Sequence, residues 1–347
     1  SENLSARYLR YWLMATGHLL REKATGTTFE AITGDVLRHH AVPVPPDGAD
    51  LAVVARIDEL LAEIDDGEGA LGCARDDLAT WRKALPKAAV TGELTADWRA
   101  ANPSAETGTD LLARILAERR ARRALDPKNK GTRHKETWAP NMDGLPYLPE
   151  GWAWARIGDL FDVFVGATPS RSDSSLWDGD VPWVSSGELG LCRISDTREK
   201  INRAALRGSA ARLHPPGTVM LGMIGEGKTR GQAAILDIEA AHNQNCASIR
   251  VSETPIPPEY IYLVLAEQYQ RTRQSSSGGN QPALNKERVK AIRIPLPGVN
   301  ECRAIAAIYD EASNAIDAFE ADRISIGAYV ATLRQSILAA AFRGDLA

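Results

Sequence analysis

The stretch AAVTGEL at residues 88–94 returns in diverged form as AAFRGDL at residues 340–346, a shift of 252 residues. The same shift places VPVP at residues 42–45 on IPLP at residues 294–297. Chance matches do not keep one offset across segments so far apart in the chain. The sequence therefore predicts two copies of one structural unit, and this repeat decides the expected fold.

The repeat extends well beyond these motifs, because the shift carries Tyr8–Leu94 onto Tyr260–Leu346 without a gap. A period this long excludes a solenoid and favours a large unit, made of a globular domain followed by a helical arm. Nothing before Ser1 matches residues 150–259, so the first copy is expected to lack its front half. Whether that half is trimmed, encoded separately or supplied by another chain stays open.

The expected fold class is α+β: mixed α/β globular domains joined by long antiparallel coiled-coil helices, with the first copy truncated in its N-terminal half. Four parts follow from the repeat. They are the end of the first globular domain (1–46), a central helical arm with a basic spacer (47–145), the second globular domain (146–298) and a distal helical arm (299–347).

Apolar residues spaced alternately three and four apart predict a coiled-coil helix in each arm. The pattern runs from Ile57 to Leu85 in the first copy and over residues 309–337 in the second, with interruptions at Gly67 and Arg323. Each arm then has a partner in the other; the alternative is that each helix packs on its own domain. The expected interface residues are Ile57, Ile64, Leu71, Leu78, Leu85, Ile316, Ile326 and Leu333.

Local signals predict where the arm helices begin and end. Asn300 is a favourable N-cap for the second arm, as Asp47 or Asp50 is for the first. Pro86 lacks a backbone N–H, so it is expected to end the regular helix of the first arm early.

Composition is that of a soluble, folded protein, with 44% hydrophobic and 25% charged residues and no apolar run long enough to span a bilayer. The first residues carry Arg7, Arg10 and His18 and no small-residue cleavage site, which argues against a signal peptide. The four cysteines form no CxxC pair, which predicts a reduced, cytoplasmic setting and no metal site. Because the formal net charge is -4, a nucleic-acid-binding surface must be local or completed by partners.

Residues 146–298 contain the glycines, prolines and short β-type runs of a mixed α/β domain. A helix is expected to open at Pro257 and Pro258 and to continue through Tyr269, followed by a polar loop, SSSGGNQ, at residues 275–281. Strands are expected at residues 181–184, 218–221, 233–236, 247–251 and 292–296.

The order of these features resembles the specificity subunit of type I restriction-modification enzymes. The shared features are a β-rich globule, a Gly-Gln loop, the IPLP strand, a long helix and a closing AFRGDL. Residues 111–123 resemble that family's spacer, and LPEGW at residues 148–152 resembles the start of its recognition domain. The resemblance covers essentially the whole chain.

The resemblance implies two target recognition domains joined by antiparallel helices. It also implies binding to a bipartite site on double-stranded DNA while two methyltransferase (M) subunits clasp the helices and restriction (R) subunits join through the complex. The chain itself is then expected to be non-catalytic and to need no cofactor, with S-adenosylmethionine bound by the partner methyltransferase. The missing front of the first domain is a departure from the family, so this chain is expected to read half of the site.

GMIGEGKT at residues 222–229 fits the P-loop pattern GxxxxGK[ST]. A P-loop needs a helix directly after it to cradle phosphate, whereas AAIL at residues 233–236 predicts a strand. Glu226 and Lys228 also satisfy half of a metal-dependent nuclease motif, with Asp196 as an available partner. A stand-alone ATPase or nuclease using this segment is therefore the alternative function, and a helical adaptor that does not bind DNA is a third.

Base reading in the major groove needs paired donors and acceptors, such as those of Arg, Asn and Gln. The Gly222–Arg230 loop is the first candidate and the Ser275–Gln281 loop the second, which the repeat carries onto residues 24–28. The alternative for each is a solvated loop or a phosphate contact. The candidate DNA-binding residues are Lys228, Arg230, Thr229, Asn280, Gln281, Arg171, Ser185, Ser186, Thr27 and Thr28.

The basic run from Arg114 to Lys135 has two interpretations. It either contacts DNA phosphates or forms a solvated helix and a surface for a partner. Its position in the family's spacer favours the second.

Overall fold

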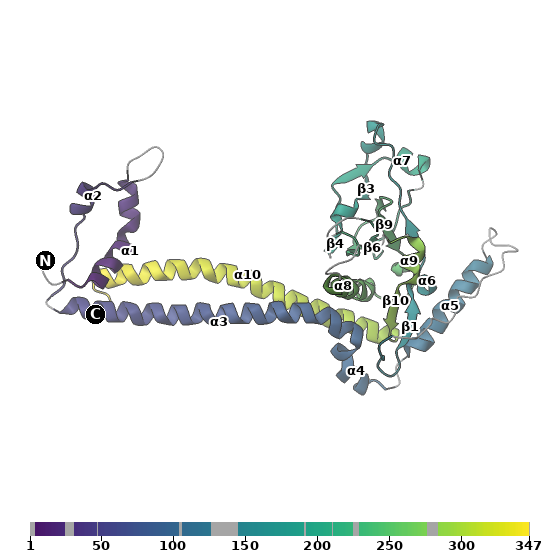
Figure 1. Ribbon diagram of the computed structural model, residues 1–347, viewed down its shortest axis with the longest axis horizontal. Helices are drawn as coiled ribbons and strands as arrows, with labels where there is room; N and C mark the ends of the chain where they lie inside the picture. Colours follow the sequence, from purple (N-terminus) through teal and green to yellow (C-terminus); the bar gives the residue numbers. More distant parts are fainter. Residues whose placement is uncertain are drawn as a thin grey trace. The chain divides into compact units, whose positions relative to one another are not determined.

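Two compact units make up the computed structural model of the chain, which describes residues 4–24, 31–46, 48–103, 106–125, 145–190, 192–209, 211–224, 229–275 and 284–346. The arm unit comprises residues 1–81 and 314–347, and the sheet unit comprises residues 82–313. Two long helices, α3 (Ala49–Thr91) and α10 (Val299–Arg343), contribute to both units (Figure 1).

The remaining elements confirm the strands and the helix expected in the second globular domain. The arm unit adds α1 (Ala6–Glu22) and α2 (Gly34–Arg38). The sheet unit has the helices α4 (Ala96–Ala101), α5 (Gly108–Leu125), α6 (Ile157–Leu160), α7 (Arg203–Gly208), α8 (Pro258–Ser275) and α9 (Lys286–Ala291). Its strands are β1 (Ala153–Arg156), β2 (Val163–Val165), β3 (Val181–Val184), β4 (Cys192–Ile194), β5 (Glu199–Ile201), β6 (Val219–Gly222), β7 (Ala233–Leu236), β8 (Ala241–His242), β9 (Cys246–Ile249) and β10 (Arg293–Leu296).

The arm unit has its core where α1 meets the pair of long helices. Ile57 of α3 and Leu338 of α10 are fully buried there, beside Tyr8 and Tyr11 of α1. Farther along, Arg334 of α10 forms ion pairs with two carboxylates of α3, Asp65 and Glu68. Residue numbers therefore rise along α3 as they fall along α10, so the two helices run antiparallel in this unit.

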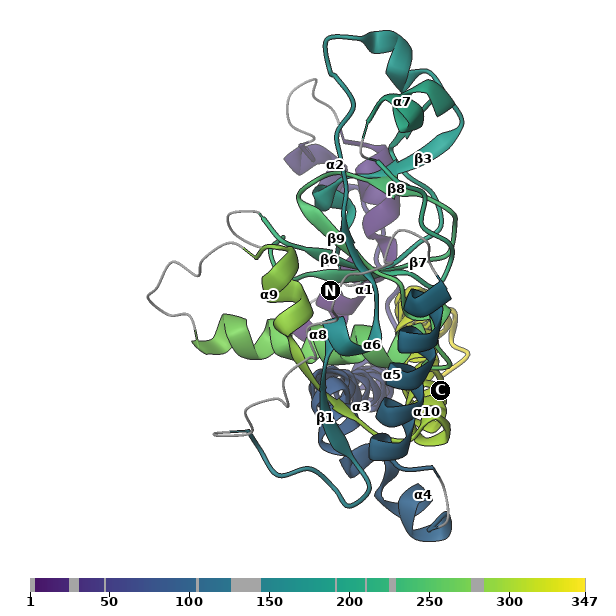
Figure 2. The same cartoon turned by 90° about the vertical axis from the view of Figure 1, so that its right-hand side faces the viewer.

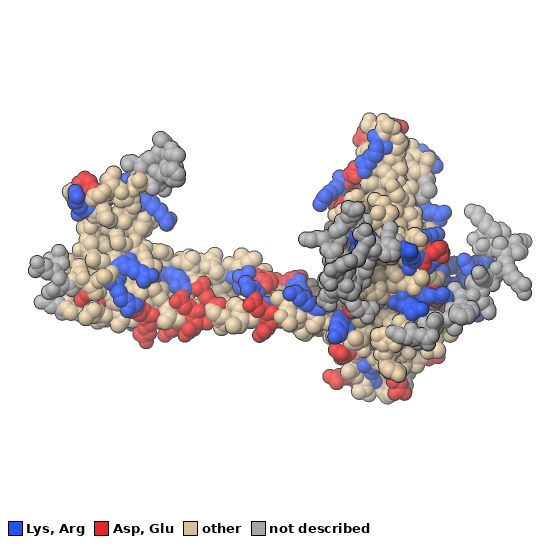
Figure 3. All heavy atoms as spheres, viewed as in Figure 1, with Lys and Arg blue, Asp and Glu red and all other residues tan. Residues whose placement is uncertain are grey.

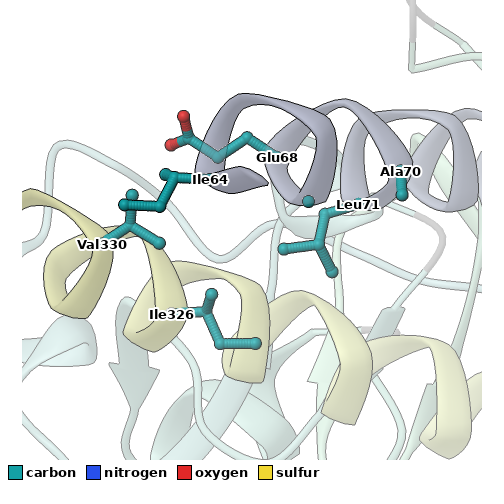
Figure 4. A pocket seen from close by; sticks show the side chains of 7 residues that line it. Ile64, Glu68, Ala70, Leu71, Ile326 and Val330 are labelled. Atoms are coloured by element: carbon teal, nitrogen blue, oxygen red, sulfur yellow. The ribbon is translucent and has the colours of Figure 1, made fainter. Parts of the chain in front are cut away.

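The middle of this helix pair is open. A groove of about 500 Å³ is lined by residues of both helices, namely Ile64, Gly67, Glu68, Ala70, Leu71, Ile326 and Val330 (Figure 4). Gly67 and Ala70 supply no side chain that fills the space opposite α10, and Ile326 is 39% exposed. Ile326, predicted as an interface residue, is therefore left partly uncovered, because small residues of α3 lie opposite it.

Two predictions about helix ends are wrong. Pro86 lies inside α3, which continues to Thr91, and Asn300 lies inside α10, which begins at Val299. A proline removes one helical hydrogen bond, but its neighbours Leu85 and Ala89 are fully buried. We attribute the continuation of the helix to this packing, which offsets the local cost.

The sheet unit is built on a five-stranded sheet in the order β2-β9-β6-β7-β4, together with a three-stranded sheet β5-β3-β8 and the pair β1-β10. Strand β6 is antiparallel to both of its neighbours, whereas β4 is parallel to β7. Helix α8 packs against β6 and β7 on one face of the larger sheet, and β3 lies on the other side (Figures 1 and 2).

Successive side chains of β6 point to opposite faces of the sheet, which explains why each face has a packed layer. Val219 and Leu221 join the core formed with α8, while Met220 joins a second core with Val184 of β3. Every residue of β6, β7 and β9 is buried. Because both faces of the sheet are covered, polar groups of these strands reach solvent only beyond the strand ends.

A buried carboxylate joins the start of α10 to the rest of the sheet unit. Glu301 is 5% exposed and accepts hydrogen bonds from the Thr95 hydroxyl (2.7 Å) and from the Trp152 indole N–H (2.9 Å). It also pairs with the guanidinium of Arg99. Burial of this charge is tolerated because both carboxylate oxygens have donors.

We expect the end of the arm interface at Ile57 and its open middle at Ile326 to differ in their contribution to the free energy of unfolding. Replacing Ile57 by alanine empties a fully buried site and lowers the free energy of unfolding by about 2–5 kcal/mol. Replacing Ile326 by alanine costs less than about 1 kcal/mol, because its side chain already faces an open groove. Urea unfolding followed by circular dichroism checks this; equal losses would mean that the groove is closed in solution.

Candidate nucleic-acid interface

One end of the central sheet gathers loops from several parts of the chain. Strand pairing places the C-terminal ends of β2, β3, β6 and β8 and the N-terminal ends of β7 and β9 together. We call this region the loop end. Its described residues are 166–168, 185, 223–224, 229–231, 243–245 and 284.

Backbone hydrogen bonds tie these loops to one another. The Asn243 N–H donates to the Val184 carbonyl (3.0 Å), and the Met223 N–H donates to the Asn245 carbonyl (2.8 Å). The Leu284 N–H in turn donates to the Met223 carbonyl (3.0 Å). The turn at residues 243–245 therefore lies between the ends of β3 and β6, and the chain leading into α9 is anchored beside it.

The described residues on either side of the P-loop-like segment form the base of a β-hairpin between β6 and β7. The Gly231 N–H donates to the Gly222 carbonyl (2.8 Å), and the Gly222 N–H donates to the Gln232 carbonyl (2.9 Å). Gly231 has a φ of +84°, and a Cβ on Gly222 would come within 2.4 Å of the Thr229 carbonyl oxygen. Both positions therefore require glycine for the hairpin itself.

This hairpin geometry removes the basis of the ATPase alternative. The segment after the loop is strand β7, antiparallel to β6, and not the helix that a P-loop needs. For the nuclease alternative, Glu226 and Lys228 lie outside the described residues. Within the described part of the chain, no group of three His, Cys, Asp or Glu residues is arranged to hold a metal ion.

Nine of the ten predicted DNA-binding residues, all except Arg171, divide into three groups. Thr229 and Arg230 are half-buried at the base of the hairpin, and Arg230 has interactions within the protein. Ser185 and Ser186 follow β3, with Ser185 at the loop end. Lys228, Asn280, Gln281, Thr27 and Thr28 lie outside the described residues.

Two of the predicted side chains are held by neighbours. The Ser185 backbone N–H (2.7 Å) and hydroxyl (2.8 Å) both donate to the Glu188 carboxylate, which caps the short turn at residues 186–188. Arg171 pairs with Glu199, and its guanidinium lies 3.6 Å from the centre of the Trp177 ring. Contact with a base edge would require Arg171 to leave this carboxylate.

The turn at residues 243–245 was missed as a candidate. It consists of three amide residues, Asn243, Gln244 and Asn245, and the Asn243 side-chain oxygen accepts the Asn245 N–H (3.1 Å). Gln244 is exposed and accepts a hydrogen bond from the Thr168 hydroxyl. The signal was present in the sequence as NQN between two apolar runs, and glutamine is one of the side chains that read adenine.

Two buried histidines lie directly beside this turn. The rings of His214 and His242 are 5.0 Å apart, and His242 Nδ1 donates to the Asn243 carbonyl (3.0 Å). Burial, together with the charges of His242, Arg250 and Arg212, lowers the pKa of His214 to about 3. Burial also lowers the pKa of His242 to about 4, so both imidazoles are neutral near pH 7.

Three arginines in the described part of the basic run form ion pairs that hold α5 within the sheet unit. Arg119 pairs with Asp162 (2.7 Å) and Arg122 pairs with Glu253 (3.1 Å). Arg114 pairs with Glu106 (2.9 Å), which lies just before the start of α5 in the chain. These cations are paired within the fold, which favours a structural role for this helix over contact with phosphates.

Comparison with known proteins connects this geometry to one family. Residues 149–326 match the family model described as the type I restriction modification DNA specificity domain. The type I restriction enzyme MjaIX specificity subunit of Methanocaldococcus jannaschii is 26% identical over 166 residues, which is 46% of this chain and 38% of that protein. The EcoBI specificity subunit of Escherichia coli is 23% identical over 339 residues, 94% of this chain and 63% of that protein.

A solved structure shares the fold along nearly the whole chain. The HsdS subunit from Thermoanaerobacter tengcongensis superimposes with a TM-score of 0.63 at 18% sequence identity, covering 99% of this chain and 71% of that one. The chain thus spans less than two thirds of the length of the curated relatives described above.

We expect the sheet unit to lose stability in mild acid. In the unfolded chain, His214 and His242 titrate near pH 6.5, whereas their folded pKa values are about 3 and about 4. The unfolded state therefore binds more protons below pH 6.5, and the free energy of unfolding falls as the pH drops from 6.5 towards 4. Urea unfolding of the His214→Gln variant should show a weaker dependence over this range than the wild type.

Substitution of His39, whose side chain is 77% exposed, by glutamine serves as the control and leaves the pH dependence unchanged. A wild-type unfolding free energy that stays constant between pH 6.5 and 4.5 would contradict the neutral buried pair.

Proposed function

Because the chain belongs to the type I restriction-modification DNA specificity family, we propose that it directs a methyltransferase complex to one half of a bipartite site on double-stranded DNA. The chain contributes no catalytic residue of its own. It reads bases through the loop end of the sheet unit and holds methyltransferase subunits on its helical arms.

The loop end is the observation that carries this proposal. Sequence reading in the major groove needs several short polar segments presented together on a rigid support. Here the hairpin after β6, the turn at residues 243–245 and the segment after β2 emerge side by side from a sheet that is buried on both faces. Gln244 and Thr168 lie on these segments with exposed or half-exposed side chains.

The charge distribution also fits a local DNA-binding surface. Asp and Glu side chains gather along one edge of the helix pair, where some Lys and Arg side chains also lie, and Lys and Arg side chains occur at several places on the sheet unit (Figure 3). The formal net charge of -4 therefore combines the acidic side chains of the helix pair with the basic side chains of the sheet unit. Affinity for phosphates is expected to reside in the sheet unit and not in the arms.

Matched contacts in the two units support the proposed internal repeat. Helices α1 and α8 begin 252 residues apart, at Ala6 and Pro258. The Tyr8 hydroxyl donates to the Pro43 carbonyl (3.1 Å), and the Tyr260 hydroxyl donates to the Pro295 carbonyl (2.7 Å). Both partners of this hydrogen bond are displaced by the same 252 positions, as two copies of one fold require.

The exposed face of α1 supports a second recognition domain. Leu9 and Leu13 are 36% and 41% exposed, whereas their counterparts Ile261 and Leu265 are buried in the core beneath the five-stranded sheet. We propose that an equivalent sheet covers α1 in the assembled protein and reads the other half of the site.

The arms offer surface for partner subunits. Ile324 (69%) and Tyr329 (67%) are exposed on the stretch of α10 that contributes Ile326 and Val330 to the groove, and Leu51 (62%) is exposed near the start of α3. Large apolar side chains in such positions are typical of a protein interface. We assign this surface to two methyltransferase subunits, with restriction subunits joining through the complex and S-adenosylmethionine bound by the methyltransferase.

The apolar surface of α10 also bears on location. Among the described helices, α10 is long and apolar enough to pass a length-and-composition test for a membrane span. Its ion pairs with Asp65 and Glu68 would be costly in a bilayer, so we attribute its apolar surface to partner subunits. We propose a cytoplasmic location, where the target DNA lies.

Co-expression with a type I methyltransferase subunit tests the function directly. We expect genomic DNA from such cells to carry methylated adenines or cytosines at one bipartite sequence, and this pattern to vanish when the chain is omitted. Sequencing that detects base modification measures both. Methylation that is absent, or that is identical without this chain, would refute the targeting role.

Base reading by the missed turn gives a sharper prediction. We expect Gln244→Ala to relax the preference at one base pair of the methylated sequence, at a cost of ~1–3 kcal/mol for the cognate base. Binding to duplexes substituted at each position measures this. The exposed residue Glu239, which lies away from the loop end, is the control, and Glu239→Ala keeps the wild-type preference.

A further inference from the structure

Three cationic side chains from separate segments converge on one aromatic ring at the edge of the central sheet. Phe164 lies on the edge strand β2. The charged groups of Arg250, Arg212 and Lys286 lie 4.8 Å, 5.2 Å and 5.9 Å from the centre of its ring. We call these four residues the Phe164 cluster.

The cations of the Phe164 cluster are only partly neutralised. Arg250 pairs with Glu253 (3.0 Å), but the same carboxylate also pairs with Arg122 (3.1 Å). Arg212 and Lys286 are exposed, and neither has a carboxylate within ion-pair distance in the part of the chain that the structure describes. The cluster therefore carries excess positive charge within a region comparable to the Debye length of ~10 Å.

The group beneath the ring adds no negative charge. The His214 ring lies 5.5 Å from the Phe164 ring and hydrogen-bonds to Ser248 (3.2 Å). Both Arg250 and Arg212 contribute, after burial and His242, to the lowered pKa of this imidazole. Their positive potential thus extends into the protein beneath the ring, and a bound anion would compensate it.

Lys286 and Phe164 place one side of the cluster next to the loop end, whereas Arg250 follows the opposite, C-terminal end of β9. Lys286 begins α9, two residues after Leu284, whose N–H is bonded to Met223. Phe164 lies on β2, two residues before the segment 166–168, which leaves β2 at the loop end. A ligand that contacts the loop end would pass close to both.

We propose that Arg212 and Lys286 bind a backbone phosphate of the target DNA, with Phe164 holding their side chains in place. Arg250, whose guanidinium donates to His214, Glu253 and Leu213, adds positive charge beside them. This inference rests on the proposed function and names the surface that fixes the register of the duplex. Guanidinium groups bind phosphate oxygens through paired N–H donors, and a lysine beside them adds a further charge. Such contacts position the protein on the duplex while neighbouring loops read the bases.

The test uses the full chain in complex with its methyltransferase subunit and two duplexes, one with the methylated sequence and one without it. We expect Arg212→Ala and Lys286→Ala to weaken binding to both duplexes by the same factor. The double variant lowers the slope of log affinity against log salt by about one unit, as loss of one phosphate contact requires. Arg212→Lys keeps the charge and recovers part of the affinity.

Lys200→Ala is the matched control. It removes one exposed cation, paired with Asp196, from the three-stranded sheet of the sheet unit, and it leaves affinity and slope unchanged. Thermal unfolding of each variant checks that the sheet unit stays folded. If an alanine variant does not fold, the Arg212→Lys variant still tests the phosphate site.

The other outcomes separate this proposal from the proposed function. If the wild-type complex prefers its sequence and the cluster variants match it in affinity and slope, the phosphate site is wrong and the function stands. A loss confined to the cognate duplex would indicate a base contact, and a loss of methyltransferase binding would indicate a protein interface; either overturns the phosphate site. If the wild-type complex shows no sequence preference, the proposed function itself fails.

Discussion

The hydrogen bonds that link Val184, Asn243, Asn245, Met223 and Leu284 are the constraint on which the functional account depends. They exist because β6, β7 and β9 are buried on both faces, so that polar residues of these strands collect where the strands end. Four segments far apart in the sequence thereby become one surface. A surface anchored to a packed sheet keeps its geometry without a bound ligand, which base reading requires.

Much of the sheet unit was predictable because its signals are local. Apolar runs marked β3, β6, β7, β9 and β10, and the paired prolines marked the start of α8. The arms were predictable only in outline. The heptad pattern located both helices, but it did not show that Gly67 and Ala70 open a groove beside Ile326 or that α3 continues through Pro86. Those outcomes depend on packing between segments that a linear pattern does not describe.

The candidate site shows the same difference between features with local sequence signals and features that depend on packing. Reasoning from residue type placed Thr229, Arg230 and Ser185 on loops, and their strands bring those loops to one end of the sheet. It did not reveal that Ser185 caps a turn through Glu188 or that Arg171 is held by Glu199. It also passed over Gln244 and the cations around Phe164, because their meaning comes from strand register and ring contacts.

Hydrogen exchange by mass spectrometry on the methyltransferase complex, with and without its methylated duplex, tests the central claim most directly. The account predicts that DNA slows exchange at residues 223–231, 243–245 and 284–286. Exchange in the groove of the arms should stay the same. Slowing confined to other parts of the sheet unit, with these segments unaffected, would contradict the assignment of the loop end as the surface that reads DNA.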